Sequence, residues 1–169
     1  MTTDPIAIVR ASLTDDVSRA LINALNAELE VIYPEPGATH FQLEPEQVSE
    51  GRGAFLVVYR ADTPVGCGAL RLMDGGTAEL KRMYMAPAAR GTGLGRRLVA
   101  ALETEARTLG VRRLLLETGI RQTAAIALYR ACGFESIPLY GEYVHSPATS
   151  LCFGKDLQDP FSLPAPEGR

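Results

Sequence analysis

Short runs of apolar residues, several of them alternating with polar residues, recur along the chain between clusters of glycine, proline and aspartate. Alternation with a period of two, or a short apolar run bounded by turn residues, is typical of β-strands. The pattern therefore predicts strands in seven places. They span residues 6–11, 54–60, 64–73, 78–85, 111–118, 133–143 and 150–157.

Apolar residues spaced three or four apart predict helices between these strands. Leu21, Leu25 and Leu29 lie on one helical face after Thr14, whose hydroxyl is suited to accept a hydrogen bond from an amide of the first turn. Thr14 is therefore the predicted N-cap of the first helix. The predicted helices cover residues 15–32, 94–109 and 123–132, with a short helical turn near Glu46.

The elements follow the order strand, helix, three strands, helix, strand, helix and two strands. Short turns join the three consecutive strands, which is typical of an antiparallel meander. We expect an α/β fold with a mixed, mostly antiparallel central sheet of about seven strands, flanked by about four helices. One domain is expected over residues 1–158, and the Pro-rich residues 159–169 are expected to form an extended or disordered tail.

Composition narrows the classes of function. The formal net charge is -3, which argues against a general nucleic-acid binder, since phosphate neutralisation needs a surplus of Lys and Arg. Cys67, Cys132 and Cys152 lie far apart and form no cluster of zinc-ligand spacing, so no metal is expected. The chain shows no long apolar run near its start, and a cytoplasmic protein without a membrane anchor is expected.

The segment MYMAPAARGTGLGRRLV, residues 83–99, carries three glycines at alternate positions between a predicted strand and a predicted helix. A helix start exposes backbone amides and the positive end of the helix dipole, and it therefore suits an anion such as phosphate. Arg90, Arg96 and Arg97 add positive charge. We predict a phosphate-binding turn; a glycine-rich turn without a ligand is the alternative.

Two common phosphate-binding motifs fit this turn poorly. A Walker loop needs Lys followed by Ser or Thr after its last glycine, but Arg96 and Arg97 follow Gly95. A dinucleotide fingerprint needs a glycine at its sixth position, and counting from Gly91 that position holds Arg96. Glu117 would be the nearest acidic residue for such a ligand.

The pattern Arg90-x-x-Gly93-x-Gly95 after a strand resembles the pyrophosphate loop of the GNAT superfamily of acetyl-CoA-dependent N-acyltransferases. Over residues 78–134, AELKRMYM resembles the family's fourth strand, GVRRLLLET its fifth, and AIALYRACGF its helix-to-strand signature. The resemblance implies that the fourth and fifth strands splay apart, so that strand backbone and turn amides bind acetyl-CoA. The cofactor-binding residues that it implies are Met83, Tyr84, Met85, Arg90, Gly91, Thr92, Gly93, Leu94, Gly95, Arg96 and Gln122, the last in place of an Asn found in many relatives.

Acyl transfer to an amine poses two proton problems. A lysine-like amine, with a pKa of about 10.4, must lose a proton before it attacks, and the departing thiolate gains from receiving one. The resemblance implies Tyr129 as the acid and Glu79 as the base. Packing of Tyr129 on the sheet and pairing of Glu79 with a neighbouring cation are the structural alternatives. An ordered water, Glu142 or His145 is the alternative base.

These observations predict an N-acetyltransferase that transfers an acetyl group from acetyl-CoA to a primary amine of a small molecule or amino-acid derivative by direct attack on the thioester. Glu30, Glu35 and Glu142 are candidates for attracting a cationic amine. The alternative is a non-catalytic acyl-CoA-binding sensor or subunit, which would need neither Tyr129 nor Glu79. A homodimer formed through the apolar final strands is left open.

Overall fold

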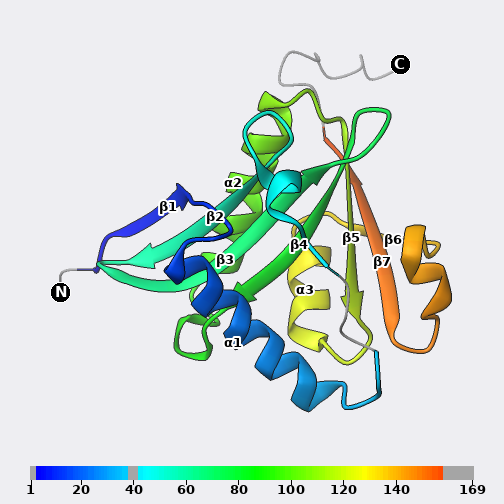
Figure 1. Ribbon diagram of the computed structural model, residues 1–169, viewed down its shortest axis with the longest axis horizontal. Coiled ribbons are helices and arrows are strands. Elements are labelled where there is room, and N and C mark those ends of the chain that lie inside the picture. Colours follow the sequence, from blue (N-terminus) through cyan, green and yellow to red (C-terminus); the bar gives the residue numbers. More distant parts are fainter. Residues whose placement is uncertain (1–2, 38–41, 158–169) are drawn as a thin grey trace, which may run out of the picture.

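The computed structural model describes residues 3–37 and 42–157. A single sheet has the order β1-β2-β3-β4-β5-β7-β6, and among its described strands only β4 and β5 pair in parallel (Figure 1). The strands are β1 (Ile6–Arg10), β2 (Gly53–Arg60), β3 (Thr63–Leu72), β4 (Thr77–Met85), β5 (Arg113–Gly119), β6 (Glu135–Ile137) and β7 (Ser150–Asp156). The helices are α1 (Asp16–Ile32), α2 (Leu94–Thr108) and α3 (Thr123–Ala131), with short 3-10 helices η1 (Pro45–Val48), η2 (Pro87–Ala89) and η3 (Gly141–His145). The mixed, mostly antiparallel α/β fold is confirmed.

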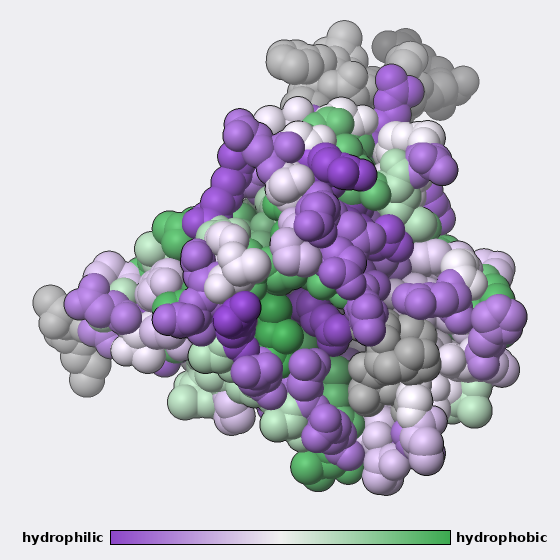
Figure 2. All heavy atoms as spheres, viewed as in Figure 1, coloured by the Kyte–Doolittle hydropathy of each residue, from purple (hydrophilic) through white to green (hydrophobic). Residues whose placement is uncertain are grey.

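Helices cover both faces of the sheet. Leu56 and Val58 of β2 belong to the core that α2 and α3 complete, whereas Phe55 and Val57 pack under α1 on the other face. Successive side chains of a strand point to opposite faces, so a strand between two helical layers needs a continuous apolar run. Hydrophilic residues cover most of the outer face shown in Figure 2.

The two parallel strands separate toward one end of the sheet (Figure 1). Their pairing ends where Leu80 lies beside Leu116. β4 then continues to Met85 and β5 to Gly119, while β4 stays hydrogen-bonded to β3 on its other side. Within the described strands, residues 81–85 of β4 therefore have one edge without a strand partner, and the predicted splay is confirmed.

Three details differ from the sequence prediction. The N-cap of α1 is Asp15 and not Thr14, because Asp15 is the last residue with extended backbone, at φ -64° and ψ 148°. The strand predicted over residues 133–143 forms only the short β6, since Pro138 has no amide for the ladder and the chain then turns into η3. The described part has three α-helices, and η1 is the predicted turn near Glu46.

The predicted tail, residues 159–169, lies outside the described residues, as do residues 38–41 of the loop after α1. Among the described residues, no helix is both long and apolar enough to cross a lipid bilayer. The same part of the chain contains no group of three or more His, Cys, Asp or Glu side chains arranged to hold a metal ion.

Candidate active site

A groove of about 480 Å³, here called the large groove, lies between the open edge of β4, the start of α2 and α3. Tyr129, the predicted acid, lines it. Two predicted residues, Thr92 and Leu94, do not line the groove. The Thr92 hydroxyl donates to the Ala89 carbonyl at 2.5 Å, and Leu94 is buried in the core. The other predicted cofactor-binding residues all line it, namely Met83, Tyr84, Met85, Arg90, Gly91, Gly93, Gly95, Arg96 and Gln122.

The glycine turn presents backbone at the start of α2. Gly91 and Gly93 have φ values of 72° and 82°, a left-handed region that L side chains rarely adopt. Gly93 is the N-cap of α2, and its carbonyl accepts the amide of Arg97 at 3.2 Å. The amides before Arg97 therefore have no intrahelical partner. A Cβ on Gly95 would lie 3.1 Å from the Leu128 side chain, so this glycine lets α2 approach α3 closely.

The arginines of the turn differ in their contacts. Arg90 donates to the Met85 carbonyl at 2.9 Å and forms an ion pair with Glu28 of α1 at 2.6 Å. Its guanidinium therefore ties the end of β4 to α1 along the large groove. Arg96 is exposed at the start of α2 and lines the groove. Its charge adds to the positive end of the helix dipole there.

A clasp, formed by Tyr33 and Glu35 after α1 and by Gly119 and Arg121 at the end of β5, joins the end of α1 to the end of β5. The buried Tyr33 hydroxyl accepts the Arg121 amide at 2.8 Å. The Arg121 guanidinium lies 5.0 Å from the Tyr33 ring centroid and pairs with Glu35. A Cβ on Gly119 would lie 1.8 Å from the Tyr33 hydroxyl, so only glycine fits. Arg121 also lines the large groove, a residue that the sequence analysis missed.

A second space of about 110 Å³, here called the small cavity, adjoins the large groove. The two spaces meet at residues that line both, which are Leu25, Met83, Gln122 and Tyr129. The small cavity is further lined by Leu29, Tyr33, Leu80, Lys81, Arg82, Glu117, Thr118, Gly119, Tyr143 and Thr149. Gln122, whose amide oxygen accepts the Thr118 hydroxyl at 2.7 Å, helps to form the boundary.

Tyr129 lies on α3 with only 5% of its surface exposed. Its ring packs edge-to-face on Phe134 at a centroid distance of 5.9 Å, and its carbonyl accepts the Phe134 amide at 3.0 Å. The Gly-Phe pair after the helix therefore fixes the tyrosine in place. Burial raises the pKa of Tyr129 well above the ordinary value of a phenol, so the hydroxyl is protonated at neutral pH and can donate a proton.

Glu117 of β5 lies on the wall of the small cavity and is partly buried. The pKa of its carboxyl is raised to about 7, chiefly by burial and also by the charges of Glu79 and Glu142, while Ser150 and the charge of Lys81 act in the opposite direction. A carboxyl that titrates near neutral pH can take up a proton during a reaction. The sequence analysis did not assign Glu117 this role; the available signal was a carboxylate at the end of an otherwise apolar strand.

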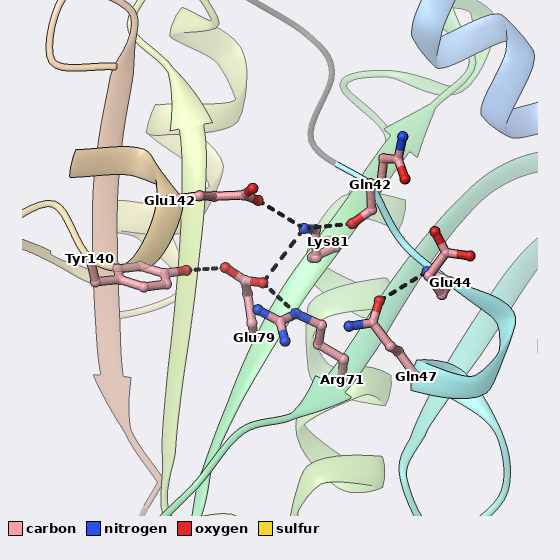
Figure 3. Close-up of polar contacts among 8 residues, drawn as sticks. All are labelled: Gln42, Glu44, Gln47, Arg71, Glu79, Lys81, Tyr140 and Glu142. Atoms are coloured by element: carbon pink, nitrogen blue, oxygen red, sulfur yellow. Dashed lines mark hydrogen bonds and ion pairs between the residues drawn. The ribbon is translucent and has the colours of Figure 1, made fainter. Parts of the chain in front are cut away.

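Glu79, the predicted base, belongs to a buried cluster of charges and lines neither of the two spaces (Figure 3). Its fully buried carboxylate accepts hydrogen bonds from Arg71 at 2.7 Å and from the Tyr140 hydroxyl at 2.5 Å. The ammonium of Lys81 lies 3.8 Å away. These contacts connect β3, β4 and the segment before η3, so the geometry gives Glu79 a structural position.

The other predicted acidic and basic candidates lie further out. Glu142 of η3 is 55% exposed and lies 3.9 Å from the Lys81 ammonium. His145 is exposed and lines neither space. Glu35 is engaged with Arg121 in the clasp. The structure thus brings Tyr129 and Glu117 to one cavity and separates them from the remaining candidates.

The split sheet, the glycine turn at a helix start and the buried tyrosine between two spaces meet in one part of the molecule. The sequence matches the Acetyltransferase (GNAT) family over residues 18–134, and the chain belongs to this family.

Relatives and solved structures agree with this assignment. The chain is 40% identical over 153 residues to the IAA acetyltransferase of Azospirillum brasilense, covering 90% of this chain and 98% of that protein. It is 33% identical over 125 residues to the uncharacterized N-acetyltransferase YjgM of Escherichia coli, covering 74% and 68%. A Klebsiella pneumoniae crystal structure, assigned provisionally as an acyl-CoA N-acyltransferase, has a TM-score of 0.76 at 36% identity, covering 90% and 98%. A Bacillus subtilis acetyltransferase in complex with CoA shares the fold, with a TM-score of 0.66 at 17% identity, covering 91% and 100%. The chain is therefore an acyltransferase, and solved proteins of this fold bind CoA.

Proposed function

We propose that this protein transfers an acetyl group from acetyl-CoA to a primary amine of a small molecule or amino-acid derivative, by direct attack of the amine on the thioester. The observation that carries the proposal is the junction of the large groove and the small cavity at Tyr129, with Glu117 on the cavity wall. One space suits a long cofactor, and the other encloses only a small group. The expected cytoplasmic location and the homodimer stay predictions.

The large groove offers backbone groups along its length to acetyl-CoA. In the proposed complex, the diphosphate binds the amides of residues 91–96 at the positive end of α2, beside Arg96. The pantetheine arm lies along residues 81–85 of β4, whose open edge offers strand hydrogen bonds. The thioester then reaches Tyr129, which lines both spaces.

In the reaction, the acceptor enters from the small cavity. Its amine loses a proton to the Glu117 carboxylate and attacks the thioester carbonyl carbon. The carbon–sulfur bond breaks, and the departing CoA sulfur takes the proton of the Tyr129 hydroxyl. The second proton of the attacking nitrogen then restores the Tyr129 phenol, and Glu117 releases its proton to solvent, so that one proton is set free in each turnover. We propose Glu117 as the base in place of Glu79, because Glu117 lines the cavity and titrates near neutral pH, whereas the Glu79 carboxylate is held by Arg71 and Tyr140.

A panel of primary amines assayed with acetyl-CoA and a thiol-detecting reagent tests this function. We expect release of CoA thiol with at least one amine, and a rate that falls at least about tenfold in Tyr129→Phe while CoA binding persists. Tyr59→Phe is the matched control, because Tyr59 of β2 lines neither space. Tight CoA binding without turnover of any amine or other acceptor would favour the non-catalytic sensor or subunit.

A further inference from the structure

Two cationic residues, Lys81 and Arg82, line the small cavity from adjacent positions on β4. Neighbours on a regular strand point to opposite faces. Here the strand is irregular, because Arg82 has a φ of 54° and the register with β3 shifts between Cys67 and Ala69. A bulge of this kind redirects side chains, and it lets two consecutive residues contribute to one wall.

The Lys81 ammonium is almost fully buried, with 8% of its side chain exposed, yet its carboxylate contacts are loose. Only the Gln42 carbonyl, at 3.1 Å, lies within hydrogen-bond distance among its three recorded partners (Figure 3). Glu79, at 3.8 Å, is already bonded to Arg71. Glu142, at 3.9 Å, is mostly exposed, and an exposed ion pair contributes little.

The charge balance of the cavity favours an additional anion. Its wall carries Lys81, Arg82 and Glu117 as ionisable groups, along with the phenols of Tyr33, Tyr129 and Tyr143. Burial raises the pKa of the Glu117 carboxyl to about 7, so at neutral pH this group is only partly ionised and does not balance both cations. Burial, together with the charges of Arg71 and Arg82, lowers the pKa of the Lys81 ammonium even though the Glu79 and Glu142 carboxylates lie 3.8 and 3.9 Å away. A carboxylate inside the cavity would supply the counter-charge.

We infer that the acceptor is a small aminocarboxylate, whose carboxylate binds the Lys81 ammonium while its amine faces Glu117. The inference rests on the proposed function and names the class of its acceptor. Arg82, which donates to Asn26 of α1 at 3.3 Å, adds long-range attraction. The cavity of about 110 Å³ encloses the amine and carboxylate ends, and the remainder of the acceptor extends toward its opening. A purely cationic amine, as the acidic residues suggested from sequence, would meet two cations here.

Binding of reaction products tests the inference without requiring turnover. The full chain, saturated with CoA, is titrated at neutral pH with N-acetylalanine, N-acetylserine and N-acetylleucine, and with the corresponding carboxamides, by calorimetry and ligand-observed NMR. We expect at least one N-acetyl amino acid to bind at least about tenfold more tightly than its carboxamide. Equal binding of both forms, or no binding of any member at millimolar concentration, would overturn the inference.

The variants locate the contact. Lys81→Met is expected to bring carboxylate binding down to the level of the carboxamide, with an unchanged circular dichroism spectrum and an unchanged denaturant midpoint as the checks on folding. Lys155→Met is the matched control, because Lys81 and Lys155 are the two lysines of the sequence and Lys155 pairs with Glu103 away from both spaces. An equal loss in both variants, or a preserved preference in Lys81→Met, would contradict the assignment.

Turnover separates the inference from the proposed function. We expect amino acids to be acetylated at lower KM than their amides, and Lys81→Met to raise the KM for the acids alone. If amides are acetylated and acids are not, the inference fails while the proposed function stands. If CoA binds and no amine of either kind is acetylated, the proposed function itself fails, and the acceptor class fails with it.

Discussion

The large groove and the small cavity meet at Tyr129, yet they present different chemical groups. The groove is formed by glycines, a helix start and the open edge of β4, so backbone groups dominate its contacts. The small cavity of about 110 Å³ has Lys81, Arg82 and Glu117 among its lining residues. Backbone groups suit a cofactor common to a family, whereas the charged residues are the ones that we propose to act as base and to select the acceptor.

The largest effect is expected on the cavity side of this comparison. Glu117→Gln removes the proposed base, and we expect kcat/KM to fall by about 10²–10⁴ with CoA affinity retained. In the unsubstituted protein, kcat/KM should rise with pH through about 7 and then level off, since the carboxylate is the active form and burial raises the pKa of Glu117 to about 7. Steady-state kinetics over a pH series measure both.

Glu79→Gln is the matched comparison for this experiment. The charge of Glu79 raises the pKa of Glu117, so its removal should move the pH midpoint of kcat/KM to a lower value and leave the rise in place. It also leaves Arg71 without its buried partner, and a stability loss of about 1–3 kcal/mol is expected in denaturant unfolding. A pH midpoint that disappears in Glu79→Gln and persists in Glu117→Gln would return the base to Glu79.

The free energy of unfolding is expected to show a second, smaller effect of the Glu117 carboxyl. Because the pKa of Glu117 is raised from 4.5 to about 7, the folded state binds its proton more tightly, and stability is lost as the pH rises between these values. Above pH 7, Glu117→Gln should therefore be more stable than the unsubstituted protein by up to about 3 kcal/mol. Below pH 4.5 the difference should vanish. Thermal or denaturant unfolding at the two extremes measures it, and equal stability throughout would argue against a buried carboxyl.

The smallest predicted effect lies on the groove side. Gly91 and Gly75 have φ values of 72° and 70°, and a Cβ at either position would meet no atom within 4 Å. Gly91→Ala and Gly75→Ala should each cost about 1–2 kcal/mol of stability through the left-handed backbone. Only Gly91→Ala should weaken CoA binding, by about tenfold, because it distorts the turn whose amides hold the diphosphate. Calorimetry compares the two, and equal CoA affinities would remove the turn from the cofactor site.

The same contrast explains what could be predicted from sequence. The predicted splay of β4 and β5 came from the family resemblance, and the resemblance depends on glycine spacing and strand-to-helix order in one short segment. The sheet followed from the alternation of apolar residues. The strand predicted over residues 133–143 ends at Ile137, directly before Pro138, and the alternation of apolar residues beyond Pro138 was too weak to define a strand.

The charged residues that line the small cavity could not be predicted from a local motif. Glu79 and Glu117 belong to different strands. The hydrogen bonds that hold the Glu79 carboxylate come from Arg71 on a third strand and from Tyr140 in a distant loop. The clasp between Tyr33 and Arg121 joins residues 88 positions apart. Such contacts arise from the tertiary fold, so the family resemblance predicted Glu79 as the base, whereas the proposal of Glu117 depends on the structure.

A crystal structure of the protein with acetyl-CoA tests the central claim most directly, because that claim is a matter of position. The diphosphate is expected on the amides of residues 91–96, and the thioester sulfur within hydrogen-bond distance of the Tyr129 hydroxyl. The acetyl group should point into the small cavity toward Glu117. A diphosphate bound away from the glycine turn, or an acetyl group directed away from that cavity, would contradict it.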